Sequence, residues 1–242
     1  MNRKTLLKIT ILIALVIIIL PQLVLSQTSI SDDELIGKGK PKLYGEGFKL
    51  REEAYIAFKK MQTEALKSDI KIGAVSSYRG FAHQKRIWER KFTSNEALGL
   101  SPTENIKKII EYSTIPGTSR HHWGTDIDIY QTNVKQPNGK LLENNFHNNG
   151  AYCKLKEWMD TNAKNYGFYL VYTDLPNRKG FKYEPWHYSY KPLSSLYLKA
   201  YRQIAIKQIL KSNDLIGSEH FTNAFITDYT KENILDINPE LL

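Results

Sequence analysis

Residues 119–130, SRHHWGTDIDIY, place two adjacent histidines shortly before two aspartates that are one residue apart. His121 and His122 supply imidazoles, and Asp126 and Asp128 supply carboxylates. These groups are typical ligands of a catalytic zinc ion, and they can also act as acids or bases. Alternate side chains of a strand share one face, so the two aspartates are expected on the same side of a sheet. The stretch alone leaves open which of the four residues would bind a metal.

Two further polar clusters lie where strands are expected to end or begin. Tyr78 and Arg79 follow the short apolar run KIGAVSS, and Gln84 comes five residues after the arginine. Near the other end of the chain, residues 184–187 read EPWH. Each cluster is weak evidence when taken alone, because short motifs occur by chance.

Taken in order, the three clusters resemble the signatures of the zinc D-alanyl-D-alanine carboxypeptidase and dipeptidase family, the VanY/VanX-like peptidases. The Ser-x-His-x-x-Gly-x-x-x-Asp signature is matched by Ser119, His121, Gly124 and Asp128. The Glu-x-x-His signature is matched by Glu184 and His187, and the Tyr-Arg signature with its later Gln by Tyr78, Arg79 and Gln84. The resemblance extends over about residues 50–190, and three signatures in the same order make it specific.

The resemblance implies one zinc ion, with His121, Asp128 and His187 as its ligands. Two imidazoles and one carboxylate leave a fourth position for water, as a hydrolytic zinc site requires. Glu184 is then the base that takes a proton from that water and passes it to the leaving amine. In a regular strand Glu184 and His187 would face opposite sides, so Pro185 is expected to mark a bend that brings both to one site.

The other matched residues are expected to bind the substrate. An exopeptidase must recognise a free terminal carboxylate, and the guanidinium of Arg79 can bind it through two hydrogen bonds. The resemblance implies the same role, with Gln84 nearby in support, and it places Ser119 in the substrate pocket as a hydrogen-bonding residue. Arg79 in a structural ion pair is the alternative.

The remaining polar residues of the central stretch have supporting roles in this interpretation. His122 competes with His121 as a ligand, but the family register favours His121, and His122 is expected to pack or to line the pocket. Asp126 stands where the family commonly has Ala. It is expected either to accept a hydrogen bond from an imidazole ligand or to pair with Arg120.

The order of the expected elements indicates an α+β fold with a small, largely antiparallel sheet flanked by helices. Helical spacing is found over residues 50–65, 81–92, 103–112, 151–167 and 193–210, and strand patterns over residues 71–78, 125–130 and 168–172, with a final strand after EPWH. The resemblance implies a fold of the hedgehog/DD-peptidase type. Gly167 is expected to end the fourth helix as its cap.

Residues 1–26 have the pattern of a secretory signal peptide, with Arg3, Lys4 and Lys8 before an apolar run. An uncleaved membrane anchor is the alternative, and either form predicts an exported protein of the periplasm or cell envelope. Residues 27–47 are expected to be a flexible lead-in and residues 48–210 the metallopeptidase domain. Residues 211–242 are interpreted as a tail that packs on the domain or stays unplaced.

Charge and cysteine content limit the remaining possibilities. The net charge of +9 falls to +6 without the three basic residues of the predicted signal, which suits an anionic cell wall more than nucleic acid. Cys153 is the only cysteine, so an intramolecular disulfide and a cysteine-based zinc site are excluded. A monomer without a nucleic-acid partner is expected.

These observations predict a zinc D-alanyl-D-alanine carboxypeptidase that trims peptidoglycan stem peptides. An L,D-carboxypeptidase, a D,D-dipeptidase or a peptidoglycan endopeptidase of the same fold are alternatives, as is a non-catalytic wall-binding module. The presence of Glu184 argues against the module, since such modules lose the base. A serine enzyme is excluded because no Ser-x-x-Lys with companion motifs is found.

Overall fold

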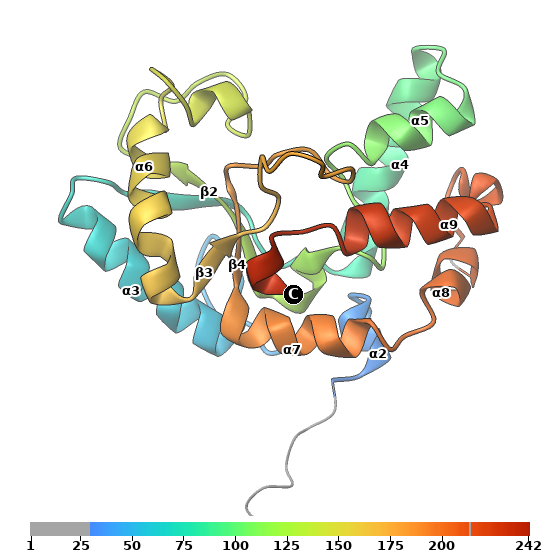
Figure 1. The fold of residues 1–242 in the computed structure, drawn as a ribbon, viewed down its shortest axis with the longest axis horizontal. Coiled ribbons are helices and arrows are strands. Elements are labelled where there is room, and N and C mark those ends of the chain that lie inside the picture. The colour runs from blue at the N-terminus through green and yellow to red at the C-terminus, as the bar shows by residue number, and fades with distance from the viewer. Residues whose placement is uncertain (1–29, 213) are drawn as a thin grey trace, which may run out of the picture. The chain divides into compact units, whose positions relative to one another are not determined.

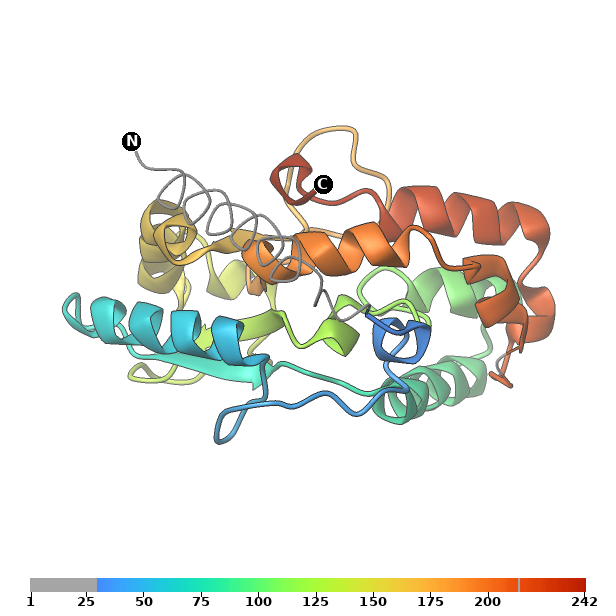
Figure 2. The same ribbon diagram turned by 90° about the horizontal axis from the view of Figure 1, so that it is seen from below.

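The structure is a computed structural model that describes residues 30–212 and 214–242. Residues 31–242 form one compact unit, which Figures 1 and 2 show from two directions. The predicted signal peptide over residues 1–26 lies outside the described residues. Within the described ranges, every helix is too short or too polar to span a bilayer.

Helices and strands alternate irregularly along the described chain. The α-helices are α2 (Asp32–Leu35), α3 (Glu52–Leu66), α4 (Phe81–Ala97), α5 (Pro102–Ile109), α6 (Cys153–Asn162), α7 (Lys191–Tyr201), α8 (Ile206–Ser212) and α9 (Asn223–Tyr229). The strands are β1 (Ile72–Ser76), β2 (Asp126–Gln131), β3 (Phe168–Leu170) and β4 (His187–Tyr190). Short 3₁₀ turns include η1 (Arg120–Trp123), directly before β2, and η3 (Ala163–Tyr166), directly after α6.

The four strands form one sheet in the order β1-β2-β4-β3, and every neighbouring pair is antiparallel. Strand β2 is central and pairs with β4 so that Asp126 lies opposite Ser189 and Asp128 lies opposite His187. The predicted α+β fold with a small antiparallel sheet is therefore confirmed.

The two faces of the sheet differ in chemistry. Helices α3 and α6 lie on the same side of the sheet (Figure 1). Their residues Phe58 and Met159 belong to a core cluster with Ile127 and Ile129 of β2, both of which are fully buried. Because side chains alternate along a strand, the two aspartates of β2 then share the opposite, polar face, as the sequence predicts.

Most predicted elements are found close to their expected bounds. Gly167 ends η3 in the left-handed conformation, with φ 77°, which confirms its predicted capping role. The helix predicted over residues 193–210 is divided instead into α7 and α8, with the break at residues 202–205.

The segment predicted as a flexible lead-in contains ordered structure. Helix α2 is capped by the Ser31 hydroxyl, which accepts from the Glu34 N–H, and Leu35 is buried. The Leu35 carbonyl accepts a hydrogen bond from the Trp123 indole at 3.1 Å, and Glu34 forms an ion pair with Arg51. A few buried contacts thus order a segment whose composition indicates a loop.

Residues 214–242 contribute helix α9 and several turns that support the polar side of the domain. The Tyr229 hydroxyl accepts a hydrogen bond from the Ile115 N–H at 3.0 Å and lies 2.8 Å from the Thr118 hydroxyl. Phe221 packs edge to face on Trp88 of α4, with ring centroids 6.0 Å apart. These contacts hold the 113–118 loop and α4 in place beside the polar face of the sheet.

Candidate metal centre

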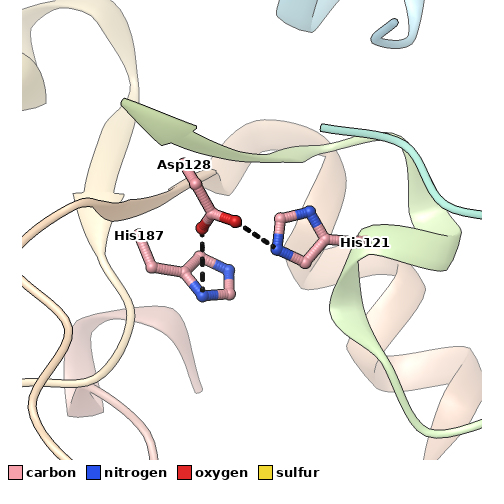
Figure 3. A group of neighbouring side chains, drawn as sticks. All are labelled: His121, Asp128 and His187. Atoms are coloured by element: carbon pink, nitrogen blue, oxygen red, sulfur yellow. Dashed lines mark ion pairs between the residues drawn. The ribbon is translucent and has the colours of Figure 1, made fainter. Parts of the chain in front are cut away.

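Three predicted ligand residues converge on the polar face of the sheet. Asp128 and His187 are cross-strand neighbours in β2 and β4, and His121 comes from η1. Gly124 ends η1 in the left-handed conformation, with φ 70°, and turns the chain from His121 into β2. Figure 3 shows both imidazoles directed at the Asp128 carboxylate. The structure thus brings together the three residues that the sequence pattern selects.

The distances within this triad suit a small metal ion. The possible ligand atoms of the three residues all lie within 4.8 Å of one another. Asp128 Oδ2 is 3.4 Å from His121 Nε2, and Asp128 Oδ1 is 3.7 Å from His187 Nδ1. A tetrahedral zinc ion with bonds of about 2.0–2.1 Å separates its ligand atoms by roughly 3.3 Å. Asp128 Oδ1 is also buried without a hydrogen-bond partner in residues 30–212 and 214–242, as expected of an atom reserved for a ligand.

Backbone and side-chain acceptors fix the orientation of both imidazoles. His121 Nδ1 donates to the Ser77 carbonyl at 2.7 Å, because a carbonyl can only accept. This leaves the Nε2 lone pair directed at Asp128. His187 Nε2 is 3.0 Å from Asp126 Oδ2, so Nδ1 is the nitrogen that faces the triad. Hydrogen bonds of this kind set the tautomer of a metal-binding histidine.

Asp126 joins His187 to a buried polar network. Its Oδ2 accepts from Arg120 Nε at 2.8 Å, and its Oδ1 accepts from the Ser189 hydroxyl at 2.6 Å. Burial raises the pKa of Asp126, but the charges of Arg120 and His187 outweigh it and hold this pKa well below its usual range. Both alternatives predicted for Asp126, an imidazole acceptor and a partner of Arg120, are therefore realised together.

The negative field at His187 favours a cation. Burial lowers the pKa of this imidazole, but the Asp128, Asp126 and Glu184 carboxylates outweigh it and raise the pKa to about 10. A proton or a metal ion at Nδ1 would be stabilised by the same three carboxylates. The site therefore has the charge balance of a cation-binding centre.

Glu184 lies beside the triad because the chain bends before β4. Residues 185 and 186 form a turn, and the His187 N–H donates to the Glu184 carbonyl at 3.1 Å. Glu184 Oε2 is 2.9 Å from His187 Nδ1. Burial raises the pKa of Glu184, which makes the carboxylate a stronger base than an exposed glutamate. The predicted bend at Pro185 is present.

His122 points away from the triad although it is adjacent to His121. Its Nδ1 donates to the Arg79 carbonyl at 2.6 Å, and its Nε2 accepts from the Gly117 N–H at 3.1 Å. Burial lowers the pKa of His122 to about 3, so the ring is neutral. His122 thus braces the backbone on both sides of the site, in agreement with its predicted packing role.

The triad lies in the wall of a cavity of about 490 Å³, which Glu184, Arg79 and Ser119 also line. The Ser119 hydroxyl and the Arg79 Nε are buried without hydrogen-bond partners among the described residues. Within that same part of the chain Arg79 forms no ion pair, which argues against the structural alternative. Both side chains are therefore available to a ligand.

Gln84 is placed differently from the prediction. It is fully buried and is not among the residues that line the cavity. Its amide donates to the Thr114 carbonyl at 2.9 Å and so anchors the 113–118 loop from behind. The geometry gives no support for a direct contact between Gln84 and substrate.

Two residues at the site escape the sequence patterns. Tyr172 lines the cavity and packs edge to face on His187, with ring centroids 5.1 Å apart. Ser189 links Arg120 to Asp126. The only signal for Ser189 is its position two residues after His187, which places both on one face of a strand.

A set of metal-ligand atoms, an adjacent carboxylate and a free guanidinium in one cavity define a candidate metallopeptidase site. A family model described as "VanY: D-alanyl-D-alanine carboxypeptidase" matches residues 47–193, which is more than half of the chain. The chain therefore belongs to the VanY D-alanyl-D-alanine carboxypeptidase family. The predicted family is confirmed, and with it the prediction of an enzyme of the carboxypeptidase type.

Individual relatives are similar to parts of this chain. An uncharacterised protein of Haemophilus influenzae is 30% identical over 43% of this chain and 82% of its own length. A D-alanyl-D-alanine carboxypeptidase of Enterococcus faecalis is 28% identical over 48% of this chain, but the match spans only 38% of that protein. The solved structure of a variant of the vancomycin resistance D,D-pentapeptidase VanY in complex with Zn(II) is 21% identical. It covers 71% of this chain and 90% of its own, with a TM-score of 0.51, and shows a shared fold.

Proposed function

We propose that this chain is a zinc-dependent D-alanyl-D-alanine carboxypeptidase that removes the terminal D-alanine of peptidoglycan stem peptides. The observation that carries the proposal is that the His121, Asp128 and His187 ligand atoms share one cavity with Glu184 and Arg79. The family name and the Zn(II) complex of a structural relative support it.

His121, Asp128 and His187 would hold one zinc ion through Nε2, a carboxylate oxygen and Nδ1. Two neutral imidazoles and a carboxylate are a ligand set typical of catalytic zinc. When bound, zinc lowers the pKa of water and stabilises negative charge on a carbonyl oxygen. Asp126 would act as a positioning residue, because its hydrogen bond keeps His187 Nδ1 free of a proton when the metal is bound.

Glu184 is the proposed general base. It is not needed as a ligand, it lies beside the triad, and burial raises the pKa of its carboxyl group. A carboxylate in this position can take the proton of the attacking water and deliver it to the departing amine. Its presence also argues against a non-catalytic binding module.

Arg79 is the proposed recognition group for the substrate's terminal carboxylate. Its buried, unpartnered Nε and its place on the cavity wall leave the guanidinium free for two parallel hydrogen bonds. Ser119 would donate its unpartnered hydroxyl to the bound peptide. A carboxypeptidase substrate has a free carboxylate next to the cleaved bond, whereas an endopeptidase substrate does not. Arg79 is therefore the residue that favours the carboxypeptidase.

The proposed setting of this reaction is the cell envelope. Three features support an exported enzyme: the signal-like N-terminus, the basic net charge, and membership of a D-alanyl-D-alanine carboxypeptidase family. The proposed partner is the peptidoglycan stem peptide, bound by a monomer with one zinc ion and without nucleic acid.

Mass spectrometry of a pentapeptide stem ending in D-Ala-D-Ala tests the proposal. Wild type should release one alanine, and the Glu184→Ala variant should release none while holding the same amount of zinc. Release of a dipeptide would assign the chain to the dipeptidases. Equal activity of both proteins would contradict the role of Glu184.

A further inference from the structure

The cavity that holds the proposed active site has a second basic region on helix α4. Ile87, Arg90 and Lys91 line the cavity at helical spacing, while Trp88 and Phe92 on the other side of the helix are buried. The Trp88 indole also donates to the Ile216 carbonyl at 3.0 Å, which fixes the helix. The two cations are therefore presented by a rigid element.

The side chains of these two cations are unpaired in the part of the chain that the structure describes. Over the described residues, neither Arg90 nor Lys91 forms a hydrogen bond or an ion pair through its side chain. Lys85 on the same helix, by contrast, contacts Glu89 and the Asp214 carbonyl. Arg90 is exposed and Lys91 is partly exposed, so both cations are accessible to an anion that enters the cavity.

The electrostatics of the cavity wall agree with an anion site. Burial and the neighbouring Arg90 lower the pKa of Lys91, and Arg79 lowers it further, while Glu184 opposes them. Glu143 also lines the cavity but is exposed, and among the described residues it forms no ion pair with either cation. Of the four cations that line the cavity, Arg120 is paired with Asp126, while Arg79, Arg90 and Lys91 have no ion-pair partner among the described residues. A peptide with only a terminal carboxylate neutralises one of these three.

We propose that Arg90 and Lys91 form a second anion subsite, which binds a carboxylate that the substrate carries in addition to its C-terminal one. This inference rests on the proposed function, since it takes Arg79 as the site of the terminal carboxylate. The substrate class is a stem peptide with an acidic group within a few residues of the cleaved bond.

The rise along α4 gives only the scale of the distance between the two carboxylates. Arg90 and Lys91 lie roughly 14–15 Å along the helix from its start next to Arg79, at 1.5 Å per residue. An extended peptide covers that distance in roughly four residues, and the long basic side chains shorten it. Two stem-peptide groups fall in this range, the second carboxylate of diaminopimelate and the α-carboxylate of γ-linked D-glutamate.

Isothermal titration of four pentapeptides to the zinc-loaded Glu184→Gln protein tests the subsite without hydrolysis. The peptides combine diaminopimelate or lysine at the third residue with D-isoglutamate or D-isoglutamine at the second. We expect binding to be about tenfold tighter for each carboxylate that reaches the subsite, a factor set by charge-assisted hydrogen bonds. A difference in affinity between the diaminopimelate and lysine peptides would show that the diaminopimelate carboxylate is bound. A difference between the D-isoglutamate and D-isoglutamine peptides would show that the glutamate carboxylate is bound.

The Arg90→Gln/Lys91→Gln variant in the same background should bind all four peptides with nearly equal affinity. The matched control is Arg86→Gln/Lys60→Gln, which removes one Arg and one Lys from exposed positions outside this cavity and should keep the preference. Equal binding by the parent protein, or a preference that survives loss of Arg90 and Lys91, would overturn the proposal. Failure of the wild type to cleave any of the four peptides would contradict the proposed function alone.

Discussion

Asp126 and Asp128 occupy the same face of the same strand, and both are buried, yet their surroundings differ. Asp126 accepts hydrogen bonds from Arg120, His187 and Ser189. Asp128 retains a buried oxygen that has no hydrogen-bond partner among the described residues. A carboxylate whose bonds are satisfied by the protein stabilises the fold, whereas one left unsatisfied is available to a ligand. This difference in hydrogen bonding distinguishes the proposed metal ligand, Asp128, from the supporting residue Asp126. Residue type and burial do not distinguish them, because they are the same for both.

The largest effect is expected from replacing Asp128 by Asn. Loss of one of three ligands should weaken zinc binding by about 100-fold or more, beyond the range seen for outer-sphere partners, and abolish hydrolysis. Competition with a chromophoric chelator measures the affinity. If Asp128→Asn binds zinc as tightly as the wild type, the unsatisfied oxygen has no role in metal binding.

Glu184→Gln should retain zinc and lose catalysis. Removal of a general base costs about 10²–10⁴-fold in rate, while the uncharged amide keeps the shape of the side chain. Single-turnover hydrolysis of the pentapeptide, with metal content measured on the same sample, provides the test. Unchanged turnover would require another group to accept the proton.

Arg79→Gln should reduce kcat/KM by about 10–100-fold for peptides with a free terminal carboxylate, the value of a charge-assisted hydrogen bond. Peptides with an amidated C-terminus should be cleaved equally poorly by both proteins. The ratio of kcat/KM for the two peptides is the measurement. An equal loss on both substrates would assign Arg79 to the fold instead of to recognition.

Asp126→Asn should lower zinc affinity by only about tenfold, since the amide oxygen can still accept from His187. It should, however, destabilise the metal-free protein by about 3–5 kcal/mol, because Arg120 remains buried without its counter-charge. Chelator competition and urea unfolding of the metal-free variant separate the two quantities.

Ser189→Ala is the matched control for Asp126→Asn. It removes two hydrogen bonds, one donated to the Asp126 carboxylate and one accepted from Arg120, and should cost about 1.5–3 kcal/mol with zinc binding unchanged. A metal-free Asp126→Asn protein as stable as the wild type would show that the two aspartates do not differ in the way their hydrogen bonds indicate.

Sequence patterns predict the fold well where periodicity is strong. The alternation of Ile127 and Ile129 with Asp126 and Asp128 fixes which face of β2 is apolar. Helix α2 was missed because a four-residue helix depends on tertiary contacts, such as the Trp123 indole on the Leu35 carbonyl, and not on local spacing.

Sequence patterns also predict part of the candidate site, because several of its residues belong to short motifs. The triad, Glu184 and Arg79 belong to short motifs, and the structure brings all of them to one cavity. Tyr172 lies two residues after β3 and lines the cavity, and Ser189 reaches Asp126 through the pairing of β2 with β4, which no local motif records. Gln84 belongs to a motif as well, but the rotation of α4 directs its side chain to the 113–118 loop.

The most direct test of the account is metal removal and restoration. Wild-type protein is stripped of metal with a chelator, and release of D-alanine from a pentapeptide stem is then followed while zinc is titrated back. The account predicts no release without metal and full release at one equivalent of zinc per chain. Full activity of the metal-free protein, or no activity at any zinc concentration on stems of any length, would contradict it.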